Sequence, residues 1–115
     1  MFDFQRLDVY NKSKNFCGEI TQLITKEKFD KTTNDQLRRA SFSIMLNIAE
    51  GTSRFSNKDR RYFMIISRGS AYECVAILEY LRDNHQISAE IYDYFYKKLE
   101  EISKMLFALI RKLES

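Results

Sequence analysis

The sequence has no proline, no tryptophan and only three glycines among its 115 residues. Because proline breaks helices and glycine destabilises their interiors, this scarcity favours long, uninterrupted helices. No stretch approaches the roughly 18 consecutive apolar residues of a membrane-spanning helix. The first ten residues, MFDFQRLDVY, contain neither an apolar signal core nor a twin-arginine pattern. We therefore expect a soluble, cytoplasmic protein that does not insert into a membrane.

Cysteine and histidine are also rare, with two cysteines and one histidine in the chain. Cys17 and Cys74 both lie among apolar residues at helical spacing, which favours buried free thiols over a disulfide or a reactive thiol. A zinc site needs several Cys or His ligands at short spacing, and none accompanies His85. The sequence therefore predicts no metal and no cofactor.

The residues that are present predict a single domain spanning residues 1–115, of which 44% are hydrophobic. Apolar residues recur at the helical period in four segments, about 7–27, 34–52, 57–83 and 89–113. Short polar links join these segments. The predicted fold is therefore an all-α, up-down-up-down antiparallel four-helix bundle.

Helix ends are indicated by capping residues and by glycine. Ser56 and Ser88 precede the third and fourth segments as N-caps, and Thr32, Thr33 and Asn34 are the candidates for the second. Gly51 is expected to end the second helix in the left-handed conformation. In the first helix, Gly18 predicts the close approach of a neighbouring helix. The buried face of that first helix is predicted to comprise Val9, Tyr10, Ser13, Phe16, Cys17, Ile20, Leu23 and Ile24.

The second helix has an apolar face, a polar stripe and apolar flanks. Its apolar face is Leu37, Ser41, Ile44 and Ile48, and the stripe opposite is Arg39, Ser43, Asn47, Glu50 and Arg54. The stripe can be a subunit interface, an exposed face carrying an i,i+4 pair, or an active site. The flanks, Phe42, Met45, Leu46 and Ala49, favour the interface. They also predict a homo-oligomer, because one four-helix core cannot absorb that much apolar surface.

The third helix is predicted to bury two adjoining stripes, leaving only Arg61, Arg68, Tyr72 and Glu79 clearly in water. Glu73 lies within one of these stripes, and a buried carboxylate requires a partner. Antiparallel pairing about a turn near Arg54 places Glu73 opposite the start of the second helix. The sequence therefore predicts an ion pair or hydrogen bond between Glu73 and Arg38 or Arg39.

Positive charge concentrates in the middle of the chain. Between residues 36 and 82 there are eight basic residues, seven of them arginine, and four acidic ones, a net charge of +4 within a chain of +3. Arginine suits bidentate contact with phosphate. We interpret Arg54, Lys58, Arg60 and Arg61 as a phosphate-binding patch, with a solvated turn and intersubunit ion pairs as the alternative.

No nucleophile–base pair, paired carboxylates, phosphate loop or metal cluster is visible, so the sequence does not indicate an enzyme. The predicted function is therefore non-enzymatic binding of RNA or DNA by an oligomer. The alternative is a protein-interaction scaffold that binds a protein partner through a tyrosine-rich surface formed by Tyr92, Tyr94 and Tyr96.

One set of motifs resembles a bacterial protein family. They are QLRRA at 36–40, Ser43-Ile44, NIAEG at 47–51, Arg54, Ser56 and Gly69-Ser70 with Glu73. The chain is similar over nearly its whole length to the four-helix-bundle proteins encoded in intervening sequences of large-subunit ribosomal RNA genes, formerly labelled ribosomal proteins. The resemblance implies a homo-oligomer, a pentamer, and kinship with the accessory proteins of diversity-generating retroelements, which bind nucleic acid and a reverse transcriptase. Related sequences usually carry a proline near Met45-Leu46 and this chain does not, so we expect a straighter second helix.

Overall fold

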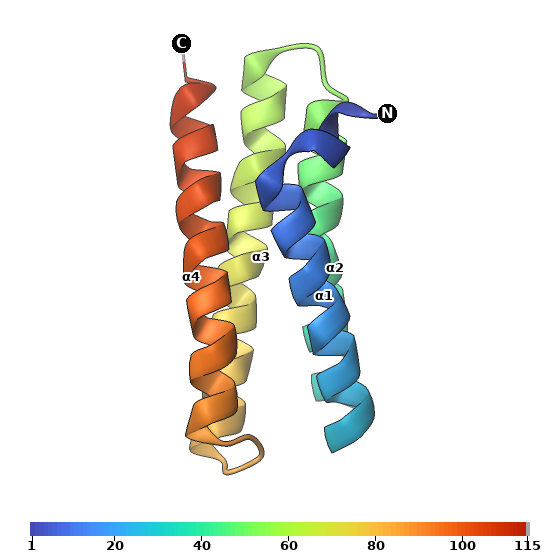
Figure 1. The fold of residues 1–115 in the computed structure, drawn as a ribbon, viewed down its shortest axis with the longest axis vertical. Helices are drawn as coiled ribbons and strands as arrows, with labels where there is room; N and C mark the ends of the chain where they lie inside the picture. The colour runs from blue at the N-terminus through green and yellow to red at the C-terminus, as the bar shows by residue number, and fades with distance from the viewer. Residues whose placement is uncertain (115) are drawn as a thin grey trace.

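The computed structural model describes residues 1–114 as four α-helices preceded by a short 3-10 helix (Figure 1). The short helix η1 spans Asp3–Arg6. The bundle helices are α1 (Asp8–Glu27), α2 (Lys31–Thr52), α3 (Asn57–Asp83) and α4 (Ala89–Lys112). No strand occurs within residues 1–114. The predicted all-α fold is confirmed.

Consecutive helices run in opposite directions, which gives the up-down-up-down arrangement (Figure 1). α1 packs against α2 and α4, and α3 packs against the same two helices. The molecule is elongated, with extents of 45 × 23 × 21 Å. The α2–α3 turn, η1 and the C-terminal end of α4 lie at one end of the bundle, and the α3–α4 turn lies at the other.

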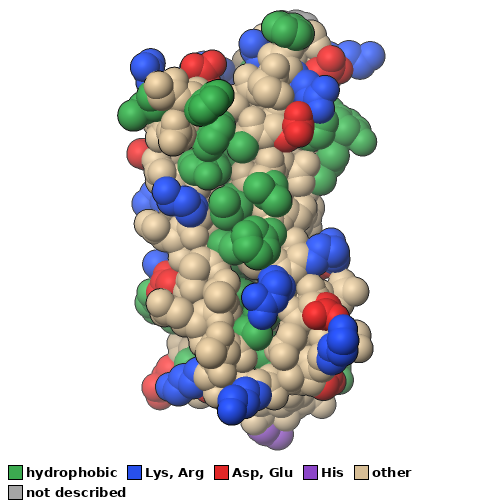
Figure 2. Space-filling model, turned by 90° about the vertical axis from the view of Figure 1, so that its right-hand side faces the viewer, with side chains coloured by type: hydrophobic (Ala, Val, Ile, Leu, Met, Phe, Trp, Pro, Cys, Tyr) green, Lys and Arg blue, Asp and Glu red, His purple; other side chains and the backbone are tan. Residues whose placement is uncertain are grey.

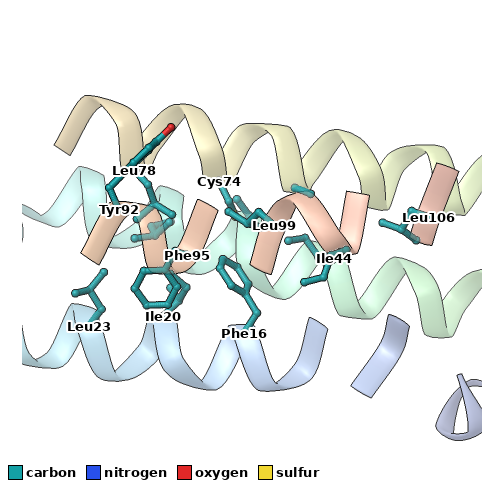
Figure 3. Packing of buried hydrophobic residues seen from close by; sticks show 14 of the residues in the cluster. Phe16, Ile20, Leu23, Ile44, Cys74, Leu78, Tyr92, Phe95, Leu99 and Leu106 are labelled. Atoms are coloured by element: carbon teal, nitrogen blue, oxygen red, sulfur yellow. The ribbon is translucent and has the colours of Figure 1, made fainter. Parts of the chain in front are cut away.

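A single apolar core runs along the bundle axis, with side chains from all four helices (Figure 3). Phe16 of α1 meets Phe95 of α4 edge to face, with ring centroids 5.8 Å apart. Each fully buried Leu, Ile or Phe contributes about 1.5–3 kcal/mol from removal of its surface from water. The buried faces predicted for the first and second helices are confirmed, because all eight α1 residues and Leu37, Ser41, Ile44 and Ile48 are buried.

α3 buries one stripe rather than the two that the sequence predicted. The inner stripe includes Ala71, Cys74 and Leu78. In the adjoining stripe, Tyr62 and Tyr80 are exposed to solvent. One helix of a four-helix bundle faces its neighbours over only part of its circumference, so the second stripe is covered only in part, with Ser70 buried and Ile66 and Ile77 half-buried.

Three serine or aspartate side chains cap the helix starts. Ser56 accepts a hydrogen bond from the Asp59 N–H (3.1 Å) and Ser88 accepts one from the Ile91 N–H (3.1 Å), as predicted. The cap of α2 is Asp30, whose carboxylate accepts from the Thr33 N–H at 2.7 Å. The prediction of Thr32, Thr33 or Asn34 was therefore wrong, and α2 begins three residues earlier than expected, at Lys31.

The roles predicted for two glycines were also wrong. None of the glycines has a positive φ, and α2 continues through Gly51 to Thr52. Gly51 instead allows a close approach, because a Cβ there would lie 2.8 Å from Met64 Cε and 3.2 Å from the Arg60 carbonyl oxygen. A Cβ on Gly18 would meet nothing within 4 Å. The left-handed residue that ends α1 is Lys28 (φ 55°).

The sequence did not predict η1, which folds back over one end of the bundle (Figure 1). The Gln5 side chain accepts from the Phe2 N–H at 2.8 Å. Phe4 packs edge-on against Tyr10 of α1, with centroids 4.7 Å apart. η1 therefore closes the core at the same end as the α2–α3 turn.

The helices also bear on the missing proline of α2 and on membrane insertion. α2 is a single continuous helix through Met45 and Leu46, where relatives were expected to carry proline. Within residues 1–114, none of the helices combines the length and apolar character needed to cross a lipid bilayer.

Candidate functional site

The polar stripe of α2 lies along its contact with α3, called here the α2–α3 seam. Arg39 forms an ion pair with Glu73 and also donates to Gln36 Oε1 at 2.9 Å. The antiparallel register predicted this partner correctly. The side chains remain 54% and 38% exposed, however, so the pair is not the buried clasp that the sequence suggested. Arg38, the other predicted partner, is exposed and forms no ion pair within the described residues.

Hydroxyl and amide groups continue the seam beyond the ion pair. The hydroxyl oxygens of Ser43 and Ser70 are 2.7 Å apart, and Asn47 Nδ2 donates to the Ser43 carbonyl at 2.8 Å. On the inner side, Ser67 Oγ donates to the Ile44 carbonyl at 2.7 Å. Small hydroxyl residues at these levels allow close contact between the helices. Arg39 and Ser43 thus join α2 to α3 within one chain. At the end of the stripe, Glu50 and Arg54 are exposed and form the i,i+4 pair that the exposed-face interpretation included.

The α2–α3 turn and the first turn of α3, residues 54–61, form a basic projection called here the tip. Arg54 pairs with Glu50 at 2.8 Å, and its guanidinium lies 4.5 Å from the centre of the Phe63 ring. Both contacts occur within the chain. They hold Arg54 against the surface of α3 and neutralise its charge in part.

Arg60 stabilises the turn through two hydrogen bonds from its guanidinium group. Its Nε donates to the Arg54 carbonyl at 2.8 Å, and its Nη1 donates to Asn57 Oδ1 at 3.3 Å. These bonds fix the backbone just after α2 to the first turn of α3. Of the four basic residues predicted as a patch, Arg54 and Arg60 thus have structural roles.

Lys58 and Arg61 are different, because no acidic side chain among residues 1–114 pairs with either of them. Lys58 is exposed and Arg61 is half-buried. Lys58 lies in the first turn of α3, where the helix dipole disfavours positive charge by about 0.3–1 kcal/mol. No ion pair within residues 1–114 therefore neutralises either of these two charges.

The sequence reading overlooked Phe55, which projects from the tip with 98% of its surface exposed. An aromatic residue between Arg54 and Ser56, outside both helices, was the signal that could have identified it. Phe2 is also strongly exposed, and Figure 1 shows the N-terminus at this end of the bundle.

Exposed apolar side chains also line the outer surface of α2. Phe42 and Leu46 are exposed, and Met45 and Ala49 are half-buried. Figure 2, which views the face formed by α1 and α2, shows hydrophobic side chains gathered in its middle and upper parts. A shallow depression continues from Leu46 and Ala49 to Phe2 and Phe4.

Aromatic side chains also line a groove between α3 and α4. Arg68 is stacked between Tyr72 and Phe107, with 4.9 and 5.3 Å from the guanidinium carbon to the ring centres. Its Nη2 also donates to the Tyr72 hydroxyl at 2.9 Å. Tyr96 lines the same groove.

The predicted tyrosine-rich surface requires one correction. Tyr94 and Tyr96 are exposed, but Tyr92 is buried, with 6% of its surface accessible. Tyr92 faces the core of the bundle, and the Arg82 guanidinium lies 4.2 Å from the centre of its ring. Burial raises the pKa of the Tyr92 hydroxyl. Tyr92 therefore belongs to the core of the bundle.

The two thiols are buried in the bundle, whereas the histidine is exposed. Cys17 and Cys74 are buried and free, as predicted, and burial raises the pKa of the Cys74 thiol far above its ordinary range. His85 is exposed in the α3–α4 turn with φ 61°. No group of three or more His, Cys, Asp or Glu side chains suited to a metal occurs within residues 1–114. The arrangement is suited to noncovalent contacts at the tip, the α2 surface and the α3–α4 groove.

Comparison with known proteins adds two findings. A family model described as 23S rRNA-intervening sequence protein matches residues 5–108. Among solved structures, the chain is similar to a protein of unknown function from the S23 ribosomal protein family of Bacteroides thetaiotaomicron. The two are 28% identical and superpose with a TM-score of 0.84, over 89% of this chain and 97% of the other. No protein with curated annotation matches.

Proposed function

The chain belongs to the 23S rRNA-intervening sequence protein family, and from this premise we propose that it is a non-enzymatic homo-oligomer that binds RNA or DNA through the tip. The observation that carries the proposal is the pair Lys58 and Arg61, which have no acidic partner within residues 1–114. Nucleic-acid phosphates bind such charges with release of condensed counterions. Binding of phosphate would also relieve the unfavourable interaction of Lys58 with the dipole of α3.

Oligomerisation would support binding because it places several copies of the tip on one particle. A single tip offers few positive charges, so one copy would bind weakly. Several copies on one particle raise the effective concentration of every further contact. The exposed apolar side chains of α2, Phe42 and Leu46, supply surface for assembly. The family resemblance implies a pentamer, which would present five equivalent tips.

The test is a double charge reversal, Lys58→Glu with Arg61→Glu. These two residues are chosen because Arg54 and Arg60 hold the turn together. The variant should bind short single-stranded RNA or DNA more weakly. The slope of log affinity against log salt concentration should be smaller in magnitude by about 1.4 for each tip engaged. Each phosphate contact on a single strand contributes about 0.7 to this slope, and the variant loses two contacts per tip.

A matched control reverses the same amount of charge elsewhere. Lys26→Glu with Lys97→Glu changes two exposed lysines on α1 and α4 and should leave both affinity and salt dependence unchanged. Circular dichroism should show equal helicity in all three proteins. Absence of binding by the unaltered protein at low salt would refute the proposal.

The α3–α4 groove favours a second candidate, a protein-interaction scaffold without nucleic-acid contact. Tyr72 and Tyr96 present aromatic surface there, and Phe107 lines the neighbouring depression together with Tyr72. Aromatic residues are enriched in protein interfaces. Binding through this groove would depend little on salt and would be lost on Tyr72→Ala. Binding through the tip would be strongly salt-dependent and would survive that substitution.

A further inference from the structure

We propose that Phe55 is a stacking platform for an unpaired base, so that the tip selects single-stranded nucleic acid over duplex. This inference rests on the proposed function and adds the kind of strand that the tip recognises. Base–aromatic stacking tolerates every base, because each base has a flat π-face. The basic residues would hold the phosphates while Phe55 holds a base.

The exposure of Phe55 is the first observation. With 98% of its surface accessible, the side chain contributes almost nothing to the core. Burial of a phenylalanine usually stabilises a protein by about 1.5–3 kcal/mol, so this position forgoes a contribution that the fold could have used. The neighbouring residues Ser53, Ser56 and Asn57 are polar, as expected for a solvated turn. Phe55 is the only apolar residue of the tip, residues 54–61.

The second observation is that both flanks of Phe55 are anchored. On one side the Arg54 carbonyl accepts from Arg60 Nε at 2.8 Å. On the other, Ser56 is the N-cap of α3 and accepts from the Asp59 N–H at 3.1 Å. The backbone is therefore held while the ring stays in solvent. Because the backbone is already held, only the side-chain rotamer of Phe55 needs to be ordered when a ligand stacks on the ring.

Charge and shape identify the ligand. Lys58 and Arg61, at the start of α3 just after Phe55 in the sequence, supply positive charge without acidic partners in residues 1–114. A ring that projects from a convex turn can reach the face of a base only where that face is open, as in single strands, loops and bulges. In a duplex the faces are covered by stacking. A lipid surface is a poorer fit, because membrane-binding elements bury a continuous apolar face, whereas Phe55 stands among charged and polar residues in the tip.

The first experiment compares Phe55→Ala with the unaltered protein on a short single-stranded RNA and on the same sequence as a blunt duplex. Loss of one stacked base should weaken single-strand binding by about tenfold to a hundredfold. Duplex affinity and the salt dependence of both should remain unchanged, because no charge is altered. Tyr80→Ala is the matched control, since Tyr80 is an exposed aromatic residue near the other end of α3 and should have no effect.

A second measurement uses the absence of tryptophan from the chain. Phe55→Trp introduces a single indole, whose emission should be that of a solvent-exposed tryptophan in the free protein. Single-stranded RNA should quench it, whereas duplex RNA and vesicles of anionic phospholipid should leave it unchanged.

The outcomes separate this inference from the function on which it rests. If the protein binds single strands with the expected salt dependence but Phe55→Ala binds equally well, stacking is refuted and the phosphate-binding tip stands. If the unaltered protein binds no nucleic acid, both are refuted. A blue-shifted emission in the free protein would show Phe55 covered by another copy, and a blue shift only with vesicles would show a lipid ligand. Either result overturns the inference.

Discussion

Partial exposure of the Arg39–Glu73 ion pair sets how much this contact can stabilise the bundle. Exposed ion pairs contribute about 0.2–1 kcal/mol, far less than buried ones, because water already solvates both charges. We expect Glu73→Gln to lower the free energy of unfolding by no more than this amount, with a smaller effect at high salt. Glu79→Gln, which removes an exposed carboxylate that forms no ion pair within the described residues, should have no effect.

Denaturant unfolding of the two variants at low and high salt checks this expectation. A salt-independent loss of about 3 kcal/mol or more for Glu73→Gln would contradict it. Such a loss would mean that another subunit covers the pair and removes it from water.

Asp30 provides a residue-scale prediction about pH. The Thr33 N–H bonds to its carboxylate and lowers the pKa of Asp30 in the folded state. Since the folded-state pKa lies below the unfolded one, the capping contribution is complete above the unfolded pKa and is lost as the pH falls through the folded pKa. Asp30→Ala should lower the melting temperature at neutral pH, and the difference should shrink in acid.

Asp30→Asn is the control for this effect, because asparagine caps helices about as well as aspartate but does not titrate. Its melting temperature should follow that of the original protein at neutral pH. Melting curves across the acidic range provide the measurement. An equal destabilisation by alanine and asparagine at neutral pH would show that charge, and not the cap hydrogen bond, stabilises the start of α2.

At the scale of helices, the three glycines differ in whether the structure leaves room for a side chain. Gly18 and Gly69 lie within α1 and α3 with nothing within 4 Å of an added Cβ. Gly18→Ala and Gly69→Ala should each stabilise the protein by about 0.5–1 kcal/mol, because alanine loses less backbone entropy in a helix. Gly51→Ala should instead destabilise it by about 1–2 kcal/mol, since the Cβ would crowd Phe63 and the Arg60 carbonyl.

Thermal or denaturant unfolding of the three variants checks this contrast. Stabilisation by all three substitutions would show that the start of α3 can move away from α2 without cost. The close contact at Gly51 would then not be what positions the tip.

Helical periodicity was enough to predict which residues of α1 and α2 are buried, because each helix has one well-defined apolar stripe. It misassigned part of α3, since the apolar residues of α3 extend around more of the helix than the bundle can cover. Tyr92 was misassigned in the opposite sense, because it was grouped with Tyr94 and Tyr96 on the surface and is buried. The start of α2 was misplaced because Asp30 and the three residues 32–34 are all good caps, and only three-dimensional contacts select among them. Antiparallel register found the Arg39–Glu73 pair. Register could not show that Arg60 braces the turn or that Phe55 stands in solvent, because both depend on side-chain conformation.

At the scale of the whole molecule, the apolar surface of α2 predicts self-association. Leu46 is 55% exposed in the single chain, so Leu46→Glu should not disturb the core. If α2 forms the subunit contact, a buried glutamate would oppose assembly strongly. Light scattering should give a multiple of 13.8 kDa for the original protein and a mass near 13.8 kDa for Leu46→Glu.

Gln22→Glu, an equivalent charge added to the outer surface of α1, should leave the assembly intact. Equal helicity of both variants would show that the loss of mass is not unfolding. A 13.8 kDa monomer for the original protein at micromolar concentration would rule out the oligomer.

The order of packing in the bundle bears on how the chain folds. Each bundle helix packs on the helix that precedes or follows it, and among the described elements the contacts that join distant parts of the sequence are those of α1 with α4 and of η1 with α2. Chains with such local contacts lose little loop entropy before their contacts form and fold quickly. α2 and α3 make the most extensive contact of all the helix pairs in residues 1–114. We therefore expect this hairpin to form during synthesis, so that the tip takes shape before α4 has been made and can close the bundle.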